Sequence, residues 1–179
     1  MKDLSLMIDN VKFNYRAGLM IEKGGKVLVE CNPEIDFVTL PGGRVKTLES
    51  SFEALKRELY EEMGIKIKKE EVKMKALIEN FFEMDNKKYH ELYFLYRLKV
   101  ETGDNRFKDG MKNNDSKASY YIWVKKDKLA EVNLLPVILR DLVKTSKFEA
   151  IVNNDLKWLN FYYIIIIKDT FKKKMYFFL

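Results

Sequence analysis

The stretch GRVKTLESSFEALKRELYEEMGI, residues 43–65, decides the fold of this chain. It matches the pattern G-x5-E-x7-R-E-U-x-E-E-x-G-U, where U is a bulky aliphatic residue. The fixed positions are Gly43, Glu49, Arg57, Glu58, Glu61, Glu62 and Gly64, with Leu59 and Ile65 as the aliphatics. At average amino-acid frequencies, so many identities at fixed spacing arise by chance about once in 10^8 start positions. Local glutamate richness does not explain such a match.

The stretch also contains signals for the two ends of a helix. Ser50 and Glu53 form the S-x-x-E pattern of a capping box, which predicts a helix beginning just after Ser50. Gly64 predicts its end, because glycine is favoured just past the last helical residue.

Three glutamates of this predicted helix, Glu58, Glu61 and Glu62, share one side. At the helical repeat they fall within an arc of about 100°. Beside this arc runs an apolar stripe expected to face the core, made of Phe52, Leu55, Leu59 and Met63. Like charges one turn apart repel, so the acidic arc is unfavourable without a counter-charge. A hard divalent cation with oxygen ligands resolves this conflict, and Mg²⁺ suits carboxylates that share a site with substrate phosphates.

The complete pattern resembles the signature of the Nudix hydrolases. Three acids alone more often form a solvated surface, but the glycine turn, Glu49 and Arg57 at the family spacing favour a metal site. The resemblance is tight over residues 43–65 and looser over about 11–147. It implies an α/β protein with the Nudix-type α/β/α sandwich and a mixed sheet, in which residues 1–154 form the hydrolase domain.

The resemblance also implies roles for the residues of the motif. Glu58, Glu61 and Glu62 resemble the metal-binding and water-activating acids of the family. A carbonyl oxygen of Gly43 or Gly42 would add a metal ligand.

Residues around these acids have supporting roles in the family. Arg57 resembles the arginine that orients the glutamates, which is close to the simpler expectation of an ion pair one turn away. Glu49 is expected to brace the loop. Other members use a further acid outside the motif, sometimes as general base, and the candidates here are Glu91, Glu101, Asp109 and Asp115. Asp115 is the preferred one, although each is more often a surface acid, and His90 is expected to be structural.

The rest of the chain predicts a sheet. Residues 17–21 and 26–31 flank a Gly-Gly turn and predict a hairpin. Further strands are predicted at 72–82, 91–100 and 120–124, with a polar surface loop at 101–118. A closing helix is predicted to begin near Pro136, with Ile138, Leu139, Leu142 and Val143 on one stripe.

Composition limits the remaining classes. The chain of 179 residues suits one domain, and its single cysteine, Cys31, excludes an intramolecular disulfide and a cysteine-based zinc site. No run reaches the roughly 18 apolar residues of a membrane span. The first residues lack the pattern of a secretory signal, so a cytoplasmic location is the default expectation. The net charge of +6 suits a polyanionic ligand but does not identify nucleic acid, which is not an expected partner.

Residues 155–179 form a C-terminal apolar and basic extension of unknown role. Ten mostly apolar residues, Trp158 to Ile167, would be an aggregation hazard if exposed. We expect them to pack as an added strand or helix on the domain or on a second copy of the chain, which would make a homodimer. A lysine-bearing anchor at a membrane surface is the alternative.

The leading hypothesis for function is a Mg²⁺-dependent hydrolase, with Mn²⁺ able to substitute. It would be a pyrophosphohydrolase acting on phosphorus-containing acid anhydrides, cleaving the diphosphate of a small nucleoside diphosphate derivative by metal-activated water. One alternative is an RNA 5′-pyrophosphohydrolase, and another is a nucleotide-sensing regulatory domain without catalysis. Intact acids argue against the latter.

The sequence does not identify the substrate. Some subfamilies carry a proline about sixteen residues after the motif, associated with ADP-ribose, or a tyrosine, associated with dinucleoside polyphosphates. This chain has Asn80, Phe81 and Phe82 there. Phe37, Phe81 or Phe82 would suit stacking on a base, although core packing is the commoner use of such rings.

Overall fold

The computed structural model describes residues 1–156. The predictions for the apolar run from Trp158 to Ile167 concern residues outside this range.

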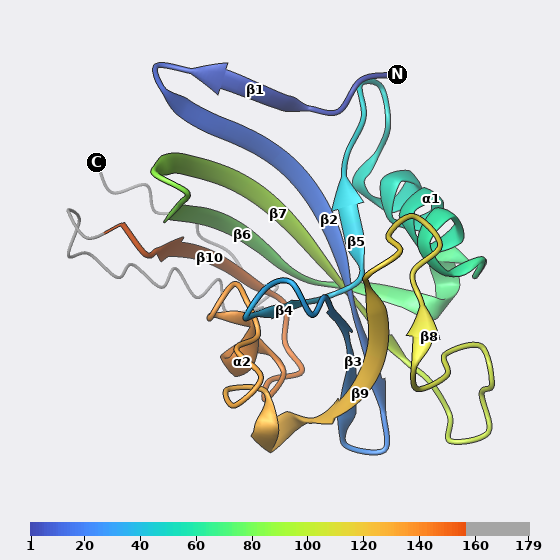
Figure 1. The fold of residues 1–179 in the computed structure, drawn as a ribbon. Coiled ribbons are helices and arrows are strands. Elements are labelled where there is room, and N and C mark those ends of the chain that lie inside the picture. Colours follow the sequence, from blue (N-terminus) through green and yellow to red (C-terminus); the bar gives the residue numbers. More distant parts are fainter. Residues whose placement is uncertain (157–179) are drawn as a thin grey trace, which may run out of the picture.

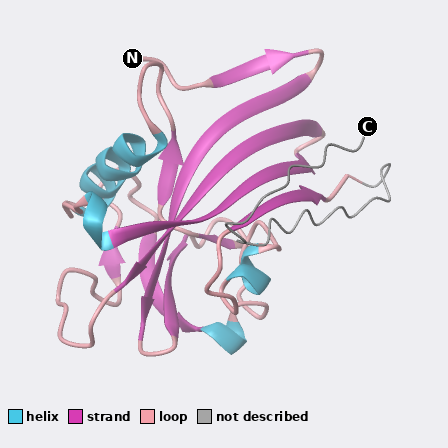
Figure 2. Cartoon of the chain, turned by 180° about the vertical axis from the view of Figure 1, so that it is seen from behind, coloured by secondary structure: helices cyan, strands magenta, loops and turns pink. Residues whose placement is uncertain are grey.

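A mixed sheet of ten strands dominates the described part of the chain (Figures 1 and 2). Seven strands follow one another in the order β10-β6-β7-β2-β3-β9-β8, while β1 and β5 pair with β2 and β4 pairs with β3. The strands are β1 Ser5–Ile8, β2 Val11–Lys23, β3 Lys26–Cys31, β4 Val38–Thr39, β5 Gly42–Arg44, β6 Val72–Met84, β7 Lys87–Lys99, β8 Met111–Lys112, β9 Tyr120–Lys125 and β10 Glu149–Asn154. Two pairs, β2 with β7 and β10 with β6, are parallel, and the other pairs are antiparallel.

Helices lie on both faces of this sheet, as the sandwich prediction requires. Helix α1, Ser51–Met63, covers one face and the short α2, Leu139–Leu142, lies at the other (Figure 1). Alternate residues of β2 contribute to two separate cores, because side chains alternate between the faces of a strand. Leu19 and Ile21 join the α1 core, while Met20 joins the α2 core. The predicted fold class is confirmed, with few helices.

Helix α1 begins and ends where the sequence predicts. The hydroxyl of the N-cap Ser50 accepts a hydrogen bond from the Glu53 N–H at 3.2 Å. Gly64 follows the helix in the left-handed conformation, with φ of 70°. Only half of the capping box forms, since the Glu53 carboxylate pairs with Lys56 at 3.0 Å instead.

The predicted closing helix is α2, Leu139–Leu142, which is only about one turn long and much shorter than its apolar stripe suggests. The chain after it is held by the sheet: Lys75 donates to the Thr145 hydroxyl and to the Lys147 carbonyl, and Arg97 donates to the Thr145 carbonyl. The two carbonyls are therefore engaged outside a helix. The chain continues into β10, a strand without a predicted counterpart.

The strands predicted at 72–82 and 91–100 are longer in the structure and pair as a hairpin with a short turn. Strands β6 and β7 pair up to Met84 and Lys87, so only Asp85 and Asn86 form the connection. Both have positive φ, 52° and 58°, which Asp and Asn tolerate better than most residues. Another departure is the short strand β8, which lies within the predicted loop 101–118. Among residues 1–156, no helix is long and apolar enough to cross a membrane.

The cap of α1 gives a stability prediction. Ser50→Ala removes the oxygen that accepts from Glu53 N–H, so we expect the free energy of unfolding to fall by about 1 kcal/mol. Urea denaturation followed by circular dichroism measures this change. Ser50→Asp is the matched control, because it keeps an acceptor and places a negative charge at the helix N-terminus. A loss in Ser50→Asp equal to that in Ser50→Ala would contradict the capping role.

Candidate active site

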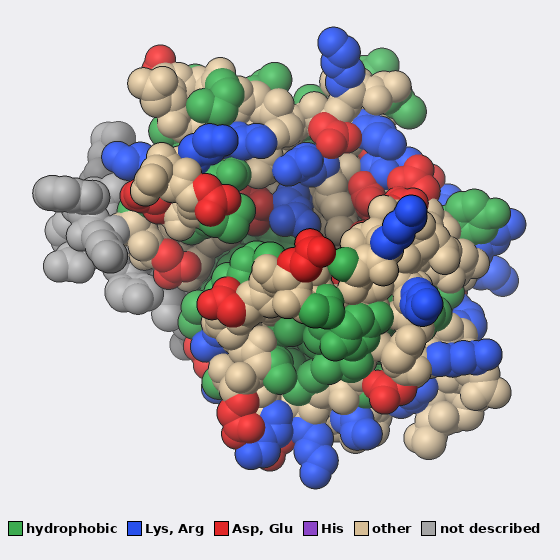
Figure 3. Space-filling view, in the orientation of Figure 1, with side chains coloured by type: hydrophobic (Ala, Val, Ile, Leu, Met, Phe, Trp, Pro, Cys, Tyr) green, Lys and Arg blue, Asp and Glu red, His purple; other side chains and the backbone are tan. Residues whose placement is uncertain are grey.

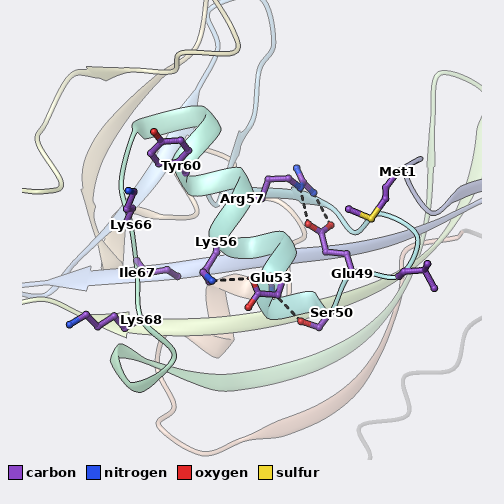
Figure 4. Close-up of a pocket in the computed structure, with 11 residues that line it drawn as sticks. Met1, Glu49, Ser50, Glu53, Lys56, Arg57, Tyr60, Lys66, Ile67 and Lys68 are labelled. Carbon is purple, nitrogen blue, oxygen red and sulfur yellow. Dashed lines mark hydrogen bonds and ion pairs between the residues drawn. The ribbon is translucent and has the colours of Figure 1, made fainter.

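Arg57 is the centre of the hydrogen-bond network on α1. Its Nε and Nη2 donate to the two carboxylate oxygens of Glu49 at 2.9 and 3.0 Å (Figure 4). Its Nη1 donates to Glu58 at 2.7 Å and to Glu61 at 2.9 Å, and Nη2 also reaches the Arg44 carbonyl at 2.9 Å. These bonds raise the pKa of Arg57, with those to Glu49 contributing most. All five N–H groups of Arg57 therefore donate hydrogen bonds within the protein, which fixes the side chain.

Glu49 joins the loop before α1 to the helix. Its Oε2 also accepts the backbone N–H of Lys46 at 2.9 Å, inside the loop. Partial burial opposes ionisation of Glu49, but the hydrogen bonds from Arg57 and Lys46 outweigh that effect and lower its pKa. Glu49 therefore joins Lys46 of the loop to Arg57 of the helix, and its bracing role stays a prediction.

The two glycines before α1 are required for different reasons. Gly42 has φ of 135°, and a Cβ there would lie 2.3 Å from the Ala17 carbonyl oxygen. A Cβ on Gly43 would lie 2.2 Å from the carboxyl carbon of Glu58. The Glu58 carboxylate thus lies directly over Gly43, and burial, opposed by the hydrogen bond from Arg57, raises its pKa.

Glu62 is the most buried of the three glutamates, with a relative exposure of 8%. Its Oε2 accepts from the Tyr121 hydroxyl at 3.0 Å. Burial raises its pKa to about 8, and repulsion from Glu30 and from Glu58 adds to the shift. A proton or a cation is needed to neutralise this carboxylate inside the fold.

Glu30 is a residue of this cluster that the sequence did not point to. It lies on β3, opposite Tyr121 of β9 in the strand register. The amide of Asn113 donates at 2.9 Å both to Glu30 and to the Tyr121 hydroxyl, and so links Glu30 to Glu62. Only the strand pairing brings Glu30 here, since no fixed spacing relates it to the motif.

The candidate acids outside the motif lie in different places. The loop with Asp115 reaches the cluster, because Asn113 Oδ1 accepts the Asp115 N–H at 2.8 Å and the Asn114 N–H bonds the Glu62 carbonyl at 2.8 Å. Asp109 accepts the Trp123 N–H at 2.8 Å and so has a structural partner. Glu101 is exposed at the start of the loop.

Glu91 and its neighbour His90 lie on β7. Glu91 is buried next to Arg16, whose Nη1 is 3.7 Å from its Oε2. His90 packs between aromatic rings, with centroid distances of 5.6 Å to Phe13 and 4.5 Å to Phe81.

A cavity of about 730 Å³ opens on the α2 face of the sheet (Figure 3). Arg16, Glu91 and Tyr93 line it from β2 and β7, and the rings of Phe37 and Phe82 line it from other segments. Burial lowers the pKa of Arg16, but the negative charges of its neighbours outweigh burial and raise it, and these neighbours include Glu91, Glu62 and Glu58. The cavity therefore lies within electrostatic reach of the acidic cluster.

A second hollow, of similar volume, lies along the outer side of α1 (Figure 4). Arg57 and Glu49 reach it, but each is bonded to the other. Lys56, Tyr60 and Lys66 are among the other residues of its wall. None of Glu58, Glu61 and Glu62 lines either hollow. We assign the candidate site to the cavity on the α2 face because Arg16 on its wall interacts electrostatically with Glu62 and Glu58.

The acids have the chemistry of a divalent-metal site without a preformed cluster. Within residues 1–156, no three His, Cys, Asp or Glu side chains converge as ligands. Arg57 draws Glu58 and Glu61 to itself, and Tyr121 holds Glu62. The donors are nevertheless hard oxygens, and the burial of Glu62 beside other carboxylates, which raises its pKa, fits a site for a cation.

The sequence matches the family model described as the NUDIX domain over residues 14–144. The chain belongs to the NUDIX family. The match confirms the resemblance inferred from the motif, and with it the enzyme class, a Nudix-type pyrophosphohydrolase. No curated protein matches the sequence.

Solved structures show the same fold at low identity. A MutT protein from Bacillus halodurans is 20% identical, with a TM-score of 0.58 and coverage of 79% of this chain and 91% of that one. A MutT NUDIX hydrolase from Burkholderia pseudomallei is 20% identical, with a TM-score of 0.57 and coverage of 75% and 98%. An Ap4A hydrolase from C. elegans is 21% identical, with a TM-score of 0.50 and coverage of 74% and 94%.

The raised pKa of Glu62 predicts a pH-dependent stability. The unfolded chain ionises Glu62 near the ordinary value of 4.5, whereas the folded chain keeps the proton up to about pH 8. The stability contributed by this proton is full below pH 4.5 and is lost as the pH rises to 8. Glu62→Gln should therefore gain stability over the wild type with rising pH, by about 1–3 kcal/mol between pH 5 and 8.5.

Urea denaturation with a chelator present, at pH 5, 7 and 8.5, measures this difference. Glu70→Gln is the control, because Glu70 is exposed and outside the cluster. A constant difference between Glu62→Gln and the wild type across this range would show that Glu62 is already ionised in the fold.

Proposed function

We propose that this protein hydrolyses the diphosphate linkage of a small nucleoside diphosphate derivative with the help of a divalent metal ion. The observation that supports this most is the acidic cluster of α1, held by a fully bonded Arg57 within electrostatic reach of a large cavity. Family membership gives the reaction class, and the cavity gives room for the organic part of a substrate.

The residues that would hold the metal are those of the motif. Glu58, Glu61 and Glu62 would supply carboxylate oxygens and Gly43 would add its carbonyl, with Mg²⁺ as the ion and Mn²⁺ as a substitute. When bound, such an ion neutralises charge on the phosphoryl oxygens and makes a bound water more acidic.

The protein's own groups would then orient the reaction. Arg57 restrains Glu58 and Glu61, so their free oxygens keep a fixed direction. Tyr121 donates to Oε2 of Glu62, and this carboxylate would bind a ligand or accept the proton of the attacking water. Asp115, on the loop tied to the same cluster, is the alternative proton acceptor. Water adds to one phosphorus, the bond from that phosphorus to the bridging oxygen breaks, and two phosphate products leave.

The cavity suits a nucleoside in both size and lining. Its volume of about 730 Å³ lies in the range of small-molecule sites. Phe37 and Phe82 offer ring faces, and Asn80 and Glu91 offer polar groups for a base. Phe81, the third aromatic candidate, packs against His90 instead.

The charge of the cavity favours a small nucleotide over RNA. Its lining includes one arginine and five carboxylates, those of Asp36, Glu83, Asp85, Glu91 and Asp155. A continuing phosphodiester backbone would meet repulsion around this rim. An RNA 5′-end therefore stays the second candidate, and nucleotide sensing without hydrolysis the third.

Turnover of a nucleotide panel tests the proposal. We expect the purified chain with Mg²⁺ or Mn²⁺ to hydrolyse at least one nucleoside diphosphate derivative, and a chelator to abolish the reaction. Phosphorus NMR of the products identifies the bond that breaks. Full turnover after exhaustive dialysis against a chelator would refute the metal requirement, and tight binding without turnover would favour the sensing function.

Glu62→Gln separates chemistry from folding. The substitution keeps the shape of the side chain and removes one charge, so turnover should fall by a factor on the order of 10^2 or more. Circular dichroism should show an unchanged fold, and Glu70→Gln should retain wild-type turnover. If Glu62→Gln unfolds the protein, this glutamate is structural and the assignment fails.

A further inference from the structure

Two arginines near the acidic cluster differ in how far their hydrogen-bond donors are used. Arg57 donates to two oxygens of Glu49, to Glu58, to Glu61 and to a carbonyl, and has no donor left for a ligand. The closest acidic group to Arg16 is the Glu91 carboxylate, at 3.7 Å from Nη1, beyond hydrogen-bond distance. The buried Nε of Arg16 has no partner among the described residues.

An arginine in this state is costly unless a ligand completes its bonds. Arg16 lines the cavity and keeps a side-chain exposure of 35%, so its guanidinium is accessible from the cavity. Leaving a buried donor unpaired costs free energy, and a guanidinium pairs most strongly with a carboxylate or phosphate through two parallel bonds. The geometry therefore suits an incoming anion.

Tyr93 brings a second donor to the same wall of the cavity. In the strand register Tyr93 of β7 lies opposite Arg16 of β2. A Cβ on Gly18 would lie 1.8 Å from the Tyr93 hydroxyl oxygen, so that hydroxyl occupies the space above Gly18. Gly18 in turn pairs with Gly42, next to the glycine beneath the Glu58 carboxylate.

Strand pairing brings these two donors close to the acids in the sheet. Arg16 pairs with Arg44 on β5, one position from Gly43, over which Glu58 lies. A diphosphate that extends from the cavity toward the acids would come close to these strand positions. One of its phosphoryl groups would meet the acids and the other would meet the donors.

We propose that Arg16, with the Tyr93 hydroxyl, binds the phosphoryl group of the substrate on the nucleoside side. The proposal rests on the function proposed above and assigns a residue for it outside the motif. Glu91 is then a positioning residue: one oxygen faces the Arg16 guanidinium and the other accepts a long bond, 3.4 Å, from Asn80. Glu91 directs the arginine and does not act as the general base.

Binding of methylenediphosphonate with Mg²⁺, measured by calorimetry, tests the assignment. This probe mimics a diphosphate, lacks a nucleoside and resists hydrolysis, so its affinity does not depend on the base or on turnover. Arg16→Met should weaken binding at least about tenfold, Arg16→Lys should weaken it less, and Tyr93→Phe should weaken it a few-fold. Arg106→Met is the control, because Arg106 has a similar exposure of 37% and pairs with Asp104 and Glu71 at the surface.

Glu91→Gln distinguishes positioning from simple electrostatics. Removal of a negative charge near an anion should by itself strengthen binding. If Glu91 directs Arg16, Glu91→Gln instead weakens binding of the probe and raises the KM of the hydrolysed nucleotide more than it lowers kcat. Tighter binding in this variant would overturn the positioning role.

The outcomes separate this assignment from the proposed function. Wild-type affinity in a folded Arg16→Met, or absence of probe binding to the wild type, would overturn the phosphoryl site. Arg16-dependent probe binding without turnover of any nucleotide would uphold the site and refute hydrolysis. Circular dichroism and the thermal midpoint of each variant establish folding, and unchanged affinity in Arg16→Lys together with lost folding in Arg16→Met would assign Arg16 a structural role.

Discussion

The hydrogen bonds of Arg57 are the constraint on which the site depends. One guanidinium holds Glu49 in the loop before α1, Glu58 and Glu61 on the helix, and a carbonyl of β5. Loop, helix and strand are therefore fixed relative to each other by a single planar group. A lysine could not replace it, since a lysine has three donors around one point and lacks the planar fork. The spacing of the motif follows from this geometry, because Glu49 and the acids have to reach the same five N–H groups.

The acidic cluster has a cost that the surrounding structure only partly offsets. Glu62 is buried near Glu30 and Glu58, and the Tyr121 hydroxyl is the side-chain donor that stabilises its charged form. A core evolved for stability alone would place an apolar side chain there. Retention of the carboxylate is consistent with use of its charge by a ligand, as stability is often sacrificed at functional sites.

Local signals in the sequence predict α1 and the acids well, and they predict long-range features poorly. Ser50 and Gly64 act on their own helix, so both ends of α1 follow from neighbouring residues. Glu30 and Arg16 become part of the site only through strand pairing with β9 and β7, which no local pattern specifies. The shortness of α2 has a similar origin, because Lys75 and Arg97 bind the groups that would extend it from a distant part of the sheet. Strand β10 escapes prediction because its alternation is weak and its partner, β6, precedes it by about seventy residues.

Strand β2 has a further consequence for how the fold tolerates change. Its odd-numbered residues Leu19 and Ile21 serve the α1 core, whereas Met20 serves the opposite core and Arg16 lines the cavity on that same side. A slip of β2 by one residue against β7 would exchange the two sets. Arg16 would then turn toward the α1 core, and an apolar side chain would enter the cavity in its place. An insertion or deletion within β2 would therefore change chemistry and folding together, whereas the turn at Gly24 and Gly25, beyond the last pair of β2 and β3, can vary in length without reaching either.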